Sequence, residues 1–214
     1  MTLYGYFRSS TSYRTRIAMN LKGLDYDYIA VNLAQDKQLE NAFKAINPQR
    51  LVPVLQADEL RLYQSPAILE WLEETYSQSP LLPKDAAGRM TVRALSAIIG
   101  CDIHPINNRR ILQYLRHELT IDEDEVMVWC QHWMVEGFAA LEKILAEDKS
   151  RGKFCYGNRP TFADCYLIPQ VSSARRFKVD LTPYPNIVAI DEHCRTLKAF
   201  DDADPTKQPD APKA

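Results

Sequence analysis

The chain has 214 residues, of which 46% are hydrophobic and 25% are charged, and its formal net charge is -2 at pH 7. This length allows one or two domains with a sizeable buried core. The nearly balanced charge gives no reason to expect nucleic acid as a partner, so any basic feature must be local. Because no apolar run approaches the roughly 20 residues that span a bilayer, and the start of the chain lacks a leader pattern, we expect a cytoplasmic protein with no membrane partner.

The cysteines and histidines are too scattered to suggest a metal centre. There are five cysteines and four histidines. An odd number of cysteines without a C-x-x-C pair supports neither a disulfide framework nor a zinc knuckle. We therefore expect no metal site.

The first 46 residues predict a β-α-β unit followed by a polar helix. Residues 3–6 form a short apolar strand, and an i, i+4, i+8 apolar stripe predicts a helix over residues 11–22. Alternating apolar residues predict a second strand over 26–33, and a polar helix is expected over 37–46. A β-α-β connection implies that the two strands are parallel.

The next segment completes a small α/β unit. Two strands are predicted at residues 54–57 and 60–63, separated by a tight turn. A helix then begins with Ser65 as the expected N-cap and Pro66 at the first helical position. Residues 1–76 thus predict a mixed sheet with helices, and in such sheets ligands bind at the ends of the strands.

The rest of the chain is predicted to be helical. Residues 77–88 contain prolines and little periodicity, so we place the domain boundary there and expect domains over 1–80 and 86–214. Helices are expected over residues 90–115 with interruptions near Gly100 and Pro105, over 122–146, after a capping box at Thr161–Asp164, and from Tyr184–Pro185. The Pro- and Lys-rich tail from Asp204 is expected to be a loose coat.

The start of the first helix carries an unusual density of hydroxyl groups. Arg8 precedes four consecutive hydroxyl residues, Ser9, Ser10, Thr11 and Ser12. A helix N-terminus has unpaired N–H groups and a positive dipole end, which favour a bound anion. One hydroxyl would suffice for an ordinary N-cap, the alternative interpretation. The stretch is therefore a candidate anion site.

Two other features of the first unit point to the same ligand. Gln64 and Ser65 at a second helix start can contact a carboxylate, although an ordinary N-cap is the preferred interpretation of Ser65 taken alone. Val52 precedes Pro53, and a cis bond there would present Val52 to an extended peptide, whereas a plain strand-entry proline is the alternative. Together they suit a small peptide with a carboxylate and a thiol, which describes glutathione.

With these residues in view, nearly the whole chain resembles the zeta class of glutathione transferases. The likeness is carried by Phe7–Arg16, similar to the class signature Ser-Ser-Cys-x-x-Arg-x-Arg, and by Asn47–Pro53, Gln64–Ser65 and Phe177–Pro185. It implies a thioredoxin-like α/β N-terminal domain, an all-α C-terminal domain, a homodimer and a cis peptide before Pro53. The chain departs from the signature in having Thr11 where the usual residue is Cys.

The resemblance also assigns candidate site residues. Ser9, Ser10 and Arg8 are the candidate catalytic residues. Arg8, Arg110 and Arg176 are the candidates for substrate binding. The candidate glutathione contacts are Ser9, Ser10, Thr11, Gln38, Gln49, Val52, Gln64, Ser65, Asp102, His104, Asn108 and Arg109.

Some of these assignments have plain alternatives. Asp102 either reaches glutathione of a neighbouring subunit or is a helix-surface charge, and His104 is more typical of a structural histidine than of a base. Arg109 and Arg110 could equally serve helix solvation. We assign no chemistry to Arg14 and Arg16, which are expected in surface or domain-interface ion pairs.

The resemblance implies glutathione-dependent cis–trans isomerisation of an acidic maleyl keto acid in aromatic-ring degradation. Maleylpyruvate, converted to fumarylpyruvate, is the preferred substrate; maleylacetoacetate is the alternative, followed by a general conjugating activity.

Reversible addition of a thiolate breaks the double bond and allows rotation. Lowering a thiol pKa from about 8.5 by about two units corresponds to roughly 2.7 kcal/mol, within reach of a helix start with hydroxyl donors, Ser9 first and Ser10 second. Disulfide exchange is disfavoured because no Cys begins the helix.

Overall fold

The computed structural model describes residues 1–149 and 151–212. It divides into two compact units: Met1–Leu81 with the segment from Arg195 onward, and Leu82–Cys194. The expected division placed everything after residue 85 in the helical domain, whereas the C-terminal segment clusters with the first unit. Phe200 and Ala203 of that segment are completely buried, which explains why it folds onto a core.

The first unit contains a four-stranded mixed sheet of strand order β2-β1-β3-β4. The strands are β1 (Thr2–Gly5), β2 (Asp27–Ala30), β3 (Val54–Ala57) and β4 (Leu60–Tyr63). β1 runs parallel to β2, with Leu3 opposite Tyr28, and antiparallel to β3, with Leu3 opposite Leu55. The predicted mixed sheet is confirmed, and β3 and β4 have the predicted bounds.

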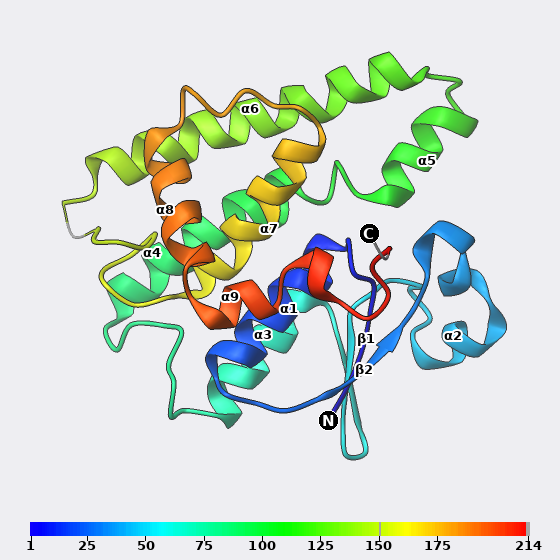
Figure 1. Ribbon diagram of the computed structural model, residues 1–214, viewed down its shortest axis with the longest axis horizontal. Coiled ribbons are helices and arrows are strands. Elements are labelled where there is room, and N and C mark those ends of the chain that lie inside the picture. The colour runs from blue at the N-terminus through cyan, green and yellow to red at the C-terminus, as the bar shows by residue number, and fades with distance from the viewer. Residues whose placement is uncertain (150, 213–214) are drawn as a thin grey trace. The chain divides into compact units, whose positions relative to one another are not determined.

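The first unit also contains four α-helices and three short 3-10 turns in its described residues. They are α1 (Ser10–Leu21), α2 (Asn41–Ile46), α3 (Ser65–Thr75) and α9 (Lys198–Asp202), with 3-10 turns η1 (Leu33–Gln35), η2 (Lys37–Leu39) and η4 (Pro205–Lys207). α1 packs beside both α3 and α9 (Figure 1). The continuous helix expected over 37–46 is wrong, because Glu40 is extended and only α2 is α-helical after it.

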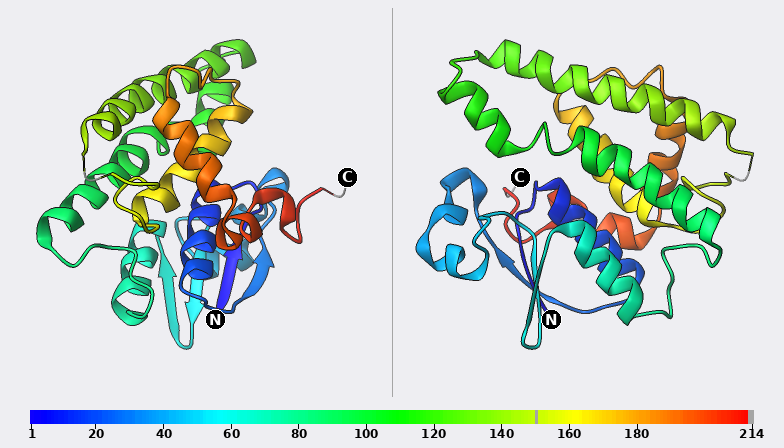
Figure 2. Two further views of the ribbon diagram at one scale, coloured as in Figure 1. Left: turned by 60° about the vertical axis from the view of Figure 1, so that its left-hand side comes forward. Right: turned by 180° about the vertical axis from the view of Figure 1, so that it is seen from behind.

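The second unit is helical, as predicted. It contains α4 (Ala86–Ala97), the π-helical segment η3 (Ile98–Ile103), α5 (Arg109–His117), α6 (Glu123–Glu147), α7 (Phe162–Arg176) and α8 (Pro185–Arg195). α4 and α7 lie side by side (Figure 2). The capping box predicted at Thr161–Asp164 is confirmed, and a second one at Asp122–Glu125 opens α6.

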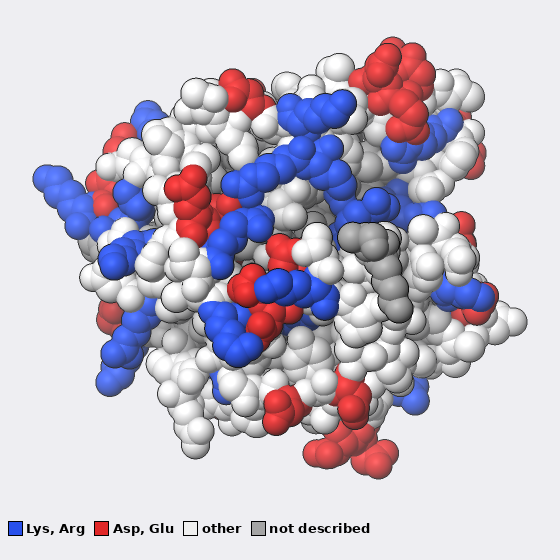
Figure 3. Space-filling model, in the orientation of Figure 1, with Lys and Arg blue, Asp and Glu red and all other residues white. Residues whose placement is uncertain are grey.

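The face drawn in Figure 3 is consistent with the small net charge. Basic and acidic side chains are interspersed over the face drawn in Figure 3, so neither sign covers it. Within the described residues, no helix combines the length and hydropathy that crossing a bilayer requires.

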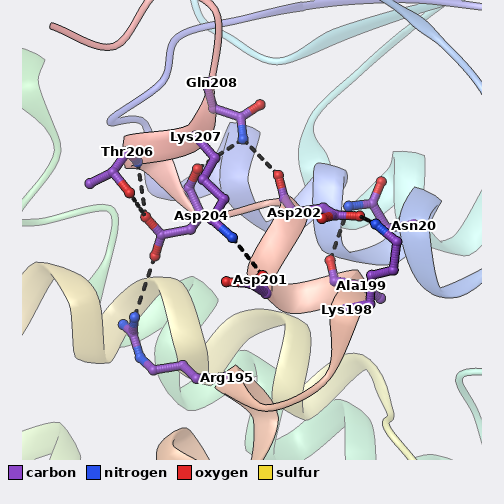
Figure 4. Close-up of polar contacts among 10 residues, drawn as sticks. All are labelled: Asn20, Arg195, Lys198, Ala199, Asp201, Asp202, Asp204, Thr206, Lys207 and Gln208. Atoms are coloured by element: carbon purple, nitrogen blue, oxygen red, sulfur yellow. Dashed lines mark hydrogen bonds and ion pairs between the residues drawn. The ribbon is translucent and has the colours of Figure 1, made fainter. Parts of the chain in front are cut away.

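The tail was expected to be a loose coat, but its described part, residues 204–212, is instead folded against the first unit. Asp204 caps η4 by accepting hydrogen bonds from Thr206, and the Asn20 amide of α1 donates to the Ala199 carbonyl (Figure 4). The expectation failed because composition favours mobility in a Pro- and Lys-rich tail, while these contacts depend on residues far away in the sequence.

Candidate functional site

The hydroxyl-rich segment begins α1, as its sequence predicted. Ser9 is the N-cap, and its Oγ accepts a hydrogen bond of 3.2 Å from the Ser12 N–H. Ser10 is the first residue of the helix. The side chains of Ser9, Ser10 and Thr11 are all partly exposed, so they remain accessible at the positive end of the helix dipole.

Hydroxyl groups connect this helix start to the segment before β3. The Thr11 hydroxyl donates to the Val52 carbonyl at 3.0 Å, and the Ser9 and Thr11 hydroxyl oxygens are 3.0 Å apart. Since Thr11 has one hydroxyl proton and gives it to Val52, Ser9 is the donor between the two hydroxyls. The Ser9 proton therefore points to Thr11 and must turn away to reach a thiolate.

The loop before β3 is held by a buried asparagine. The Val52–Pro53 peptide bond is cis, as the resemblance implied. Asn47 is 1% exposed; its Nδ2 donates to the Leu51 carbonyl at 2.8 Å, and its Oδ1 accepts from the Gln49 N–H at 3.0 Å. From the sequence, Asn47 was named only as part of the stretch Asn47–Pro53 that carries the family likeness, so this supporting role was missed; an Asn between a predicted helix and a predicted strand was the available signal.

The start of α3 differs from expectation in one respect. Ser65 is not the N-cap: Gln64 is, with φ of 68°, and its side chain makes no capping hydrogen bond. Ser65 is the first helical residue, and its buried Oγ accepts a hydrogen bond of 2.9 Å from Arg14 Nη1. The Gln64 amide donates to the Gln49 amide oxygen at 2.8 Å, so these two candidate contacts lie together.

The two arginines to which we assigned no chemistry are not on the surface. Arg14 is 2% exposed and Arg16 is 0% exposed. The part of the expectation that placed them in surface ion pairs is therefore wrong. Arg14 links α1 to the Ser65 hydroxyl of α3, which makes it part of the support of the site. Sequence reasoning missed this because an Arg on a helix is usually solvated.

The remaining first-unit candidates lie in different surroundings. Arg8 is exposed, with its guanidinium 6.0 Å from the Phe7 ring centroid. Gln38 is buried, and its Nε2 donates to Asp36 at 3.0 Å. Its Oε1 is also buried and has no hydrogen-bond partner among the described residues.

The second unit holds five candidates on one short stretch, residues 102–110. Asp102 is exposed within η3, and His104 directly after it is half-buried. Asn108 is the N-cap of α5, where its side chain accepts the Arg110 N–H at 3.2 Å. Arg109 and Arg110 are the first two residues of this helix, so two cations and an amide gather at a helix start.

Arg176 lies on a separate helix of the second unit, at the C-terminal end of α7. Its Nη2 donates to Ser173 Oγ at 3.1 Å, and its guanidinium lies 4.9 Å from the Phe177 ring centroid. These contacts leave an exposed guanidinium in a defined position. Such a group suits a forked contact with a carboxylate.

The first unit therefore brings together three backbone segments that sequence reasoning singled out: the start of α1, the loop at Val52 and the start of α3. The links are direct hydrogen bonds from Thr11, Arg14 and Gln64. Their combination of helix-start N–H groups, hydroxyls and amides fits a peptide-like ligand that carries a carboxylate and a thiolate.

Comparison with known proteins gives the class to which this fold and site belong. Residues 8–75 match the family described as Glutathione S-transferase, N-terminal domain, and residues 134–190 match Glutathione S-transferase, C-terminal domain. The chain is 57% identical to a holo structure of maleyl pyruvate isomerase, a bacterial glutathione S-transferase in the zeta class, with a TM-score of 0.98 over 99% of this chain and 100% of that one. The chain belongs to the glutathione S-transferase family, in its zeta class.

Within that class the similarity is to isomerases. The chain is 58% identical to maleylpyruvate isomerase from Ralstonia sp over 99% of its own length and 100% of the relative's. It is also similar to a maleylacetoacetate isomerase from Methylobacterium extorquens with bound malonate and GSH: 34% identity and a TM-score of 0.96, with 100% of both chains covered. The expected glutathione transferase fold is thereby confirmed.

Proposed function

We propose that this protein is a glutathione-dependent cis–trans isomerase that converts maleylpyruvate to fumarylpyruvate. The observation that carries the proposal is the start of α1, where Ser9, Ser10 and Thr11 gather around a helix N-terminus that carries no cysteine. A site built for a thiolate but lacking its own thiol requires a ligand that brings the sulfur. The 58% identity with maleylpyruvate isomerase supports this choice of reaction.

The electrostatics of the α1 N-terminus explain how the site would stabilise the thiolate of glutathione. When bound, glutathione supplies a thiolate that adds reversibly to the conjugated double bond and so permits rotation from cis to trans. The N-terminus of α1 stabilises that negative charge, and hydroxyl donors lower the thiol pKa further. Ser9 donates once its proton turns from Thr11 to the sulfur, and Ser10 is the second donor.

The peptide end of glutathione would lie across the other two segments. The free N–H groups at the start of α3, with Ser65 and Gln64, suit its γ-glutamyl carboxylate. The Val52 backbone suits an extended peptide, and Gln49 adds an amide. Gln38 and the stretch from Asp102 to Arg109 complete the proposed contacts.

Three arginines would recognise the acidic substrate. Arg8, Arg110 and Arg176 all have exposed guanidinium groups. Maleylpyruvate carries two carboxylates and gains further negative charge on an oxygen as its double bond opens, so planar fork donors are preferred over point charges. The malonate bound with GSH in the Methylobacterium relative supports an acidic second substrate.

Assembly and location also belong to the proposal: a cytoplasmic homodimer that acts in aromatic-ring degradation. Within this proposal we place the dimer contact on one face of α4, where Met90 is 62% exposed beside an open hollow of about 570 Å³. The hollow is lined by Ala86, Arg89, Met90, Arg93, Ala94 and Ala97.

The deciding experiment mixes the purified protein with maleylpyruvate, with and without glutathione. We expect glutathione-dependent loss of substrate absorbance and formation of fumarylpyruvate. Turnover of maleylacetoacetate with no turnover of maleylpyruvate would reassign the substrate. Lack of retention on immobilised glutathione, together with no turnover of either acid, would refute the proposal.

A further inference from the structure

The backbone of Phe7 is held on both sides, by Asp210 of the C-terminal segment and by Arg16 of α1. The Phe7 N–H donates to Asp210 Oδ2 at 2.9 Å, and the Phe7 carbonyl accepts a hydrogen bond of 3.1 Å from Arg16 Nη2. Phe7 lies between the end of β1 and Ser9, the N-cap of α1. The position of Phe7 therefore determines where Arg8 and Ser9 lie.

The C-terminal segment supplies one of these anchors and holds the other in place. Asp210 contacts Phe7 directly, and Arg16 is itself fixed by donating from Nε to the Ala203 carbonyl at 3.0 Å. Arg16 and Ala203 are completely buried. Burial lowers the pKa of Arg16, and the negative charge of Asp210 is among the groups that oppose this change. The carboxylate thus partly compensates a buried cation beneath the loop.

Tyr28 of β2 lies close to both Arg16 and Asp210. Burial raises the pKa of its phenol, the positive charge of Arg16 lowers that pKa, and the negative charge of Asp210 raises it. The phenol and the carboxylate are therefore neighbours. Asp210 accordingly accepts a hydrogen bond from one backbone N–H of the first unit and lies within electrostatic range of Arg16 and Tyr28, unlike a residue of a loose tail.

The segment leading to Asp210 has a defined path (Figure 4). Asp204 accepts hydrogen bonds from the Thr206 N–H at 2.9 Å and hydroxyl at 2.7 Å, and it pairs with Arg195 at 3.3 Å. The Gln208 amide donates to the carbonyls of Asp202 at 3.0 Å and Asp204 at 2.8 Å. These bonds close the turn that carries the chain back toward Phe7.

We infer that the segment Ala203–Asp210 is a brace for the loop Phe7–Ser9, and that Asp210 is a positioning residue for the start of α1. The brace acts through the two Phe7 hydrogen bonds: without Asp210 the loop loses one directly, and Arg16 loses a nearby counter-charge. The effect on Ser9 and Arg8 rests on the proposed function, whereas the effect on the loop does not.

The test compares Asp210→Ala with Asp210→Asn, which keeps an acceptor for the Phe7 N–H but removes the charge. The matched control is Asp201→Ala, which removes an exposed carboxylate of α9 that makes only a solvent-exposed ion pair with Lys207 of the brace. Hydrogen exchange of residues 6–10 is measured without any ligand. The pKa of the bound glutathione thiol is then followed by thiolate absorbance, and kcat and KM are measured with maleylpyruvate.

For Asp210→Ala we expect exchange of residues 6–10 to accelerate about tenfold, the effect of losing a hydrogen bond to a charged group. The thiol pKa should rise and kcat/KM should fall by a similar factor, with a smaller change for Asp210→Asn and none for Asp201→Ala. If Asp210→Ala fails to fold, Asp210→Asn and a chain ending at Gln208 are measured in the same way.

Unchanged exchange in residues 6–10 would overturn the brace. Faster exchange with an unchanged thiol pKa and unchanged kcat/KM would overturn the positioning role. Because the exchange experiment uses no substrate, a protein that fails to isomerise maleylpyruvate refutes the proposed function while the brace is still decided by exchange.

Discussion

The hydroxyl of Thr11 has a structural role at a position where the class signature has a cysteine thiol. It occupies the position at which the class signature has Cys, and its proton goes to the Val52 carbonyl. The residue thus joins the start of α1 to the loop that precedes β3. Its role is to hold two parts of the site together and to orient the Ser9 hydroxyl.

Thr11→Val removes this hydroxyl and keeps the branched shape. We expect the KM for glutathione to rise about 2- to 10-fold, because a net hydrogen bond contributes about 0.5–1.5 kcal/mol. Thr11→Ser keeps the hydroxyl and serves as the control in the same steady-state assay. Equal losses in the two variants would show that the methyl group, rather than the hydroxyl, matters.

Arg176 is the residue at which recognition of the acid is most directly tested. Arg176→Ala should raise the KM for maleylpyruvate about 10- to 100-fold, since hydrogen bonds to charged groups contribute about 1.5–3 kcal/mol. Arg176→Lys, which keeps the charge but not the fork, should be intermediate. The KM for glutathione is measured in parallel, and equal changes for both ligands would count against the assigned role.

At the scale of elements, two helices begin with the same motif in different surroundings. Asp164 of α7 is 0% exposed and accepts from the N–H groups of Cys155 at 2.8 Å and Thr161 at 2.7 Å. Asp122 of α6 is exposed and accepts from the Glu125 N–H at 2.8 Å. Burial, and not the motif, should therefore decide how much each cap stabilises the protein.

Asp164→Ala leaves three buried donors unpaired, the N–H groups of Cys155 and Thr161 and the Thr161 hydroxyl. At about 1–3 kcal/mol each, we expect the free energy of unfolding to fall by about 3 kcal/mol or more. Asp122→Ala exposes its donor to water and should cost about 1 kcal/mol. Urea denaturation of the two variants and the wild type measures both values. Equal losses would mean that the buried donors of α7 find other partners.

At the scale of the whole molecule, the proposed homodimer makes the α4 face an interface. Ala94 lines the open hollow on that face, whereas Ala87 is exposed on the same helix outside it. Ala94→Arg adds a third cation beside Arg89 and Arg93 and should weaken the dimer at least about tenfold, equivalent to about 1.4 kcal/mol. Ala87→Arg should leave it intact.

Sedimentation over a range of concentrations measures this difference. A monomer–dimer equilibrium unchanged by Ala94→Arg would place the interface elsewhere. Activity per subunit is measured on the same samples, because the alternative for Asp102 assigns it a contact with glutathione of the neighbouring subunit.

The local sequence pattern by itself determined the bounds of two strands and the starts of two helices. Residues 54–57 and 60–63 are strands with the predicted bounds, and the capping box at Thr161–Asp164 opens a helix where it was expected. The hydroxyl run at Ser9–Ser12 also lies at a helix start. These features depend on side-chain periodicity and on hydrogen bonds between near neighbours, which the order of residues contains.

Tertiary structure decided the parts that depend on distant partners. Arg14 and Arg16 are buried because Ser65, Phe7 and Ala203 accept their hydrogen bonds, and none of these is close enough in sequence to be inferred from a pattern. The C-terminal tail is ordered for the same reason, since Asp210 lies 203 positions from the Phe7 N–H that it binds. A buried guanidinium group is stable only where the fold brings hydrogen-bond acceptors to it. Which acceptors it meets is decided by the folded chain.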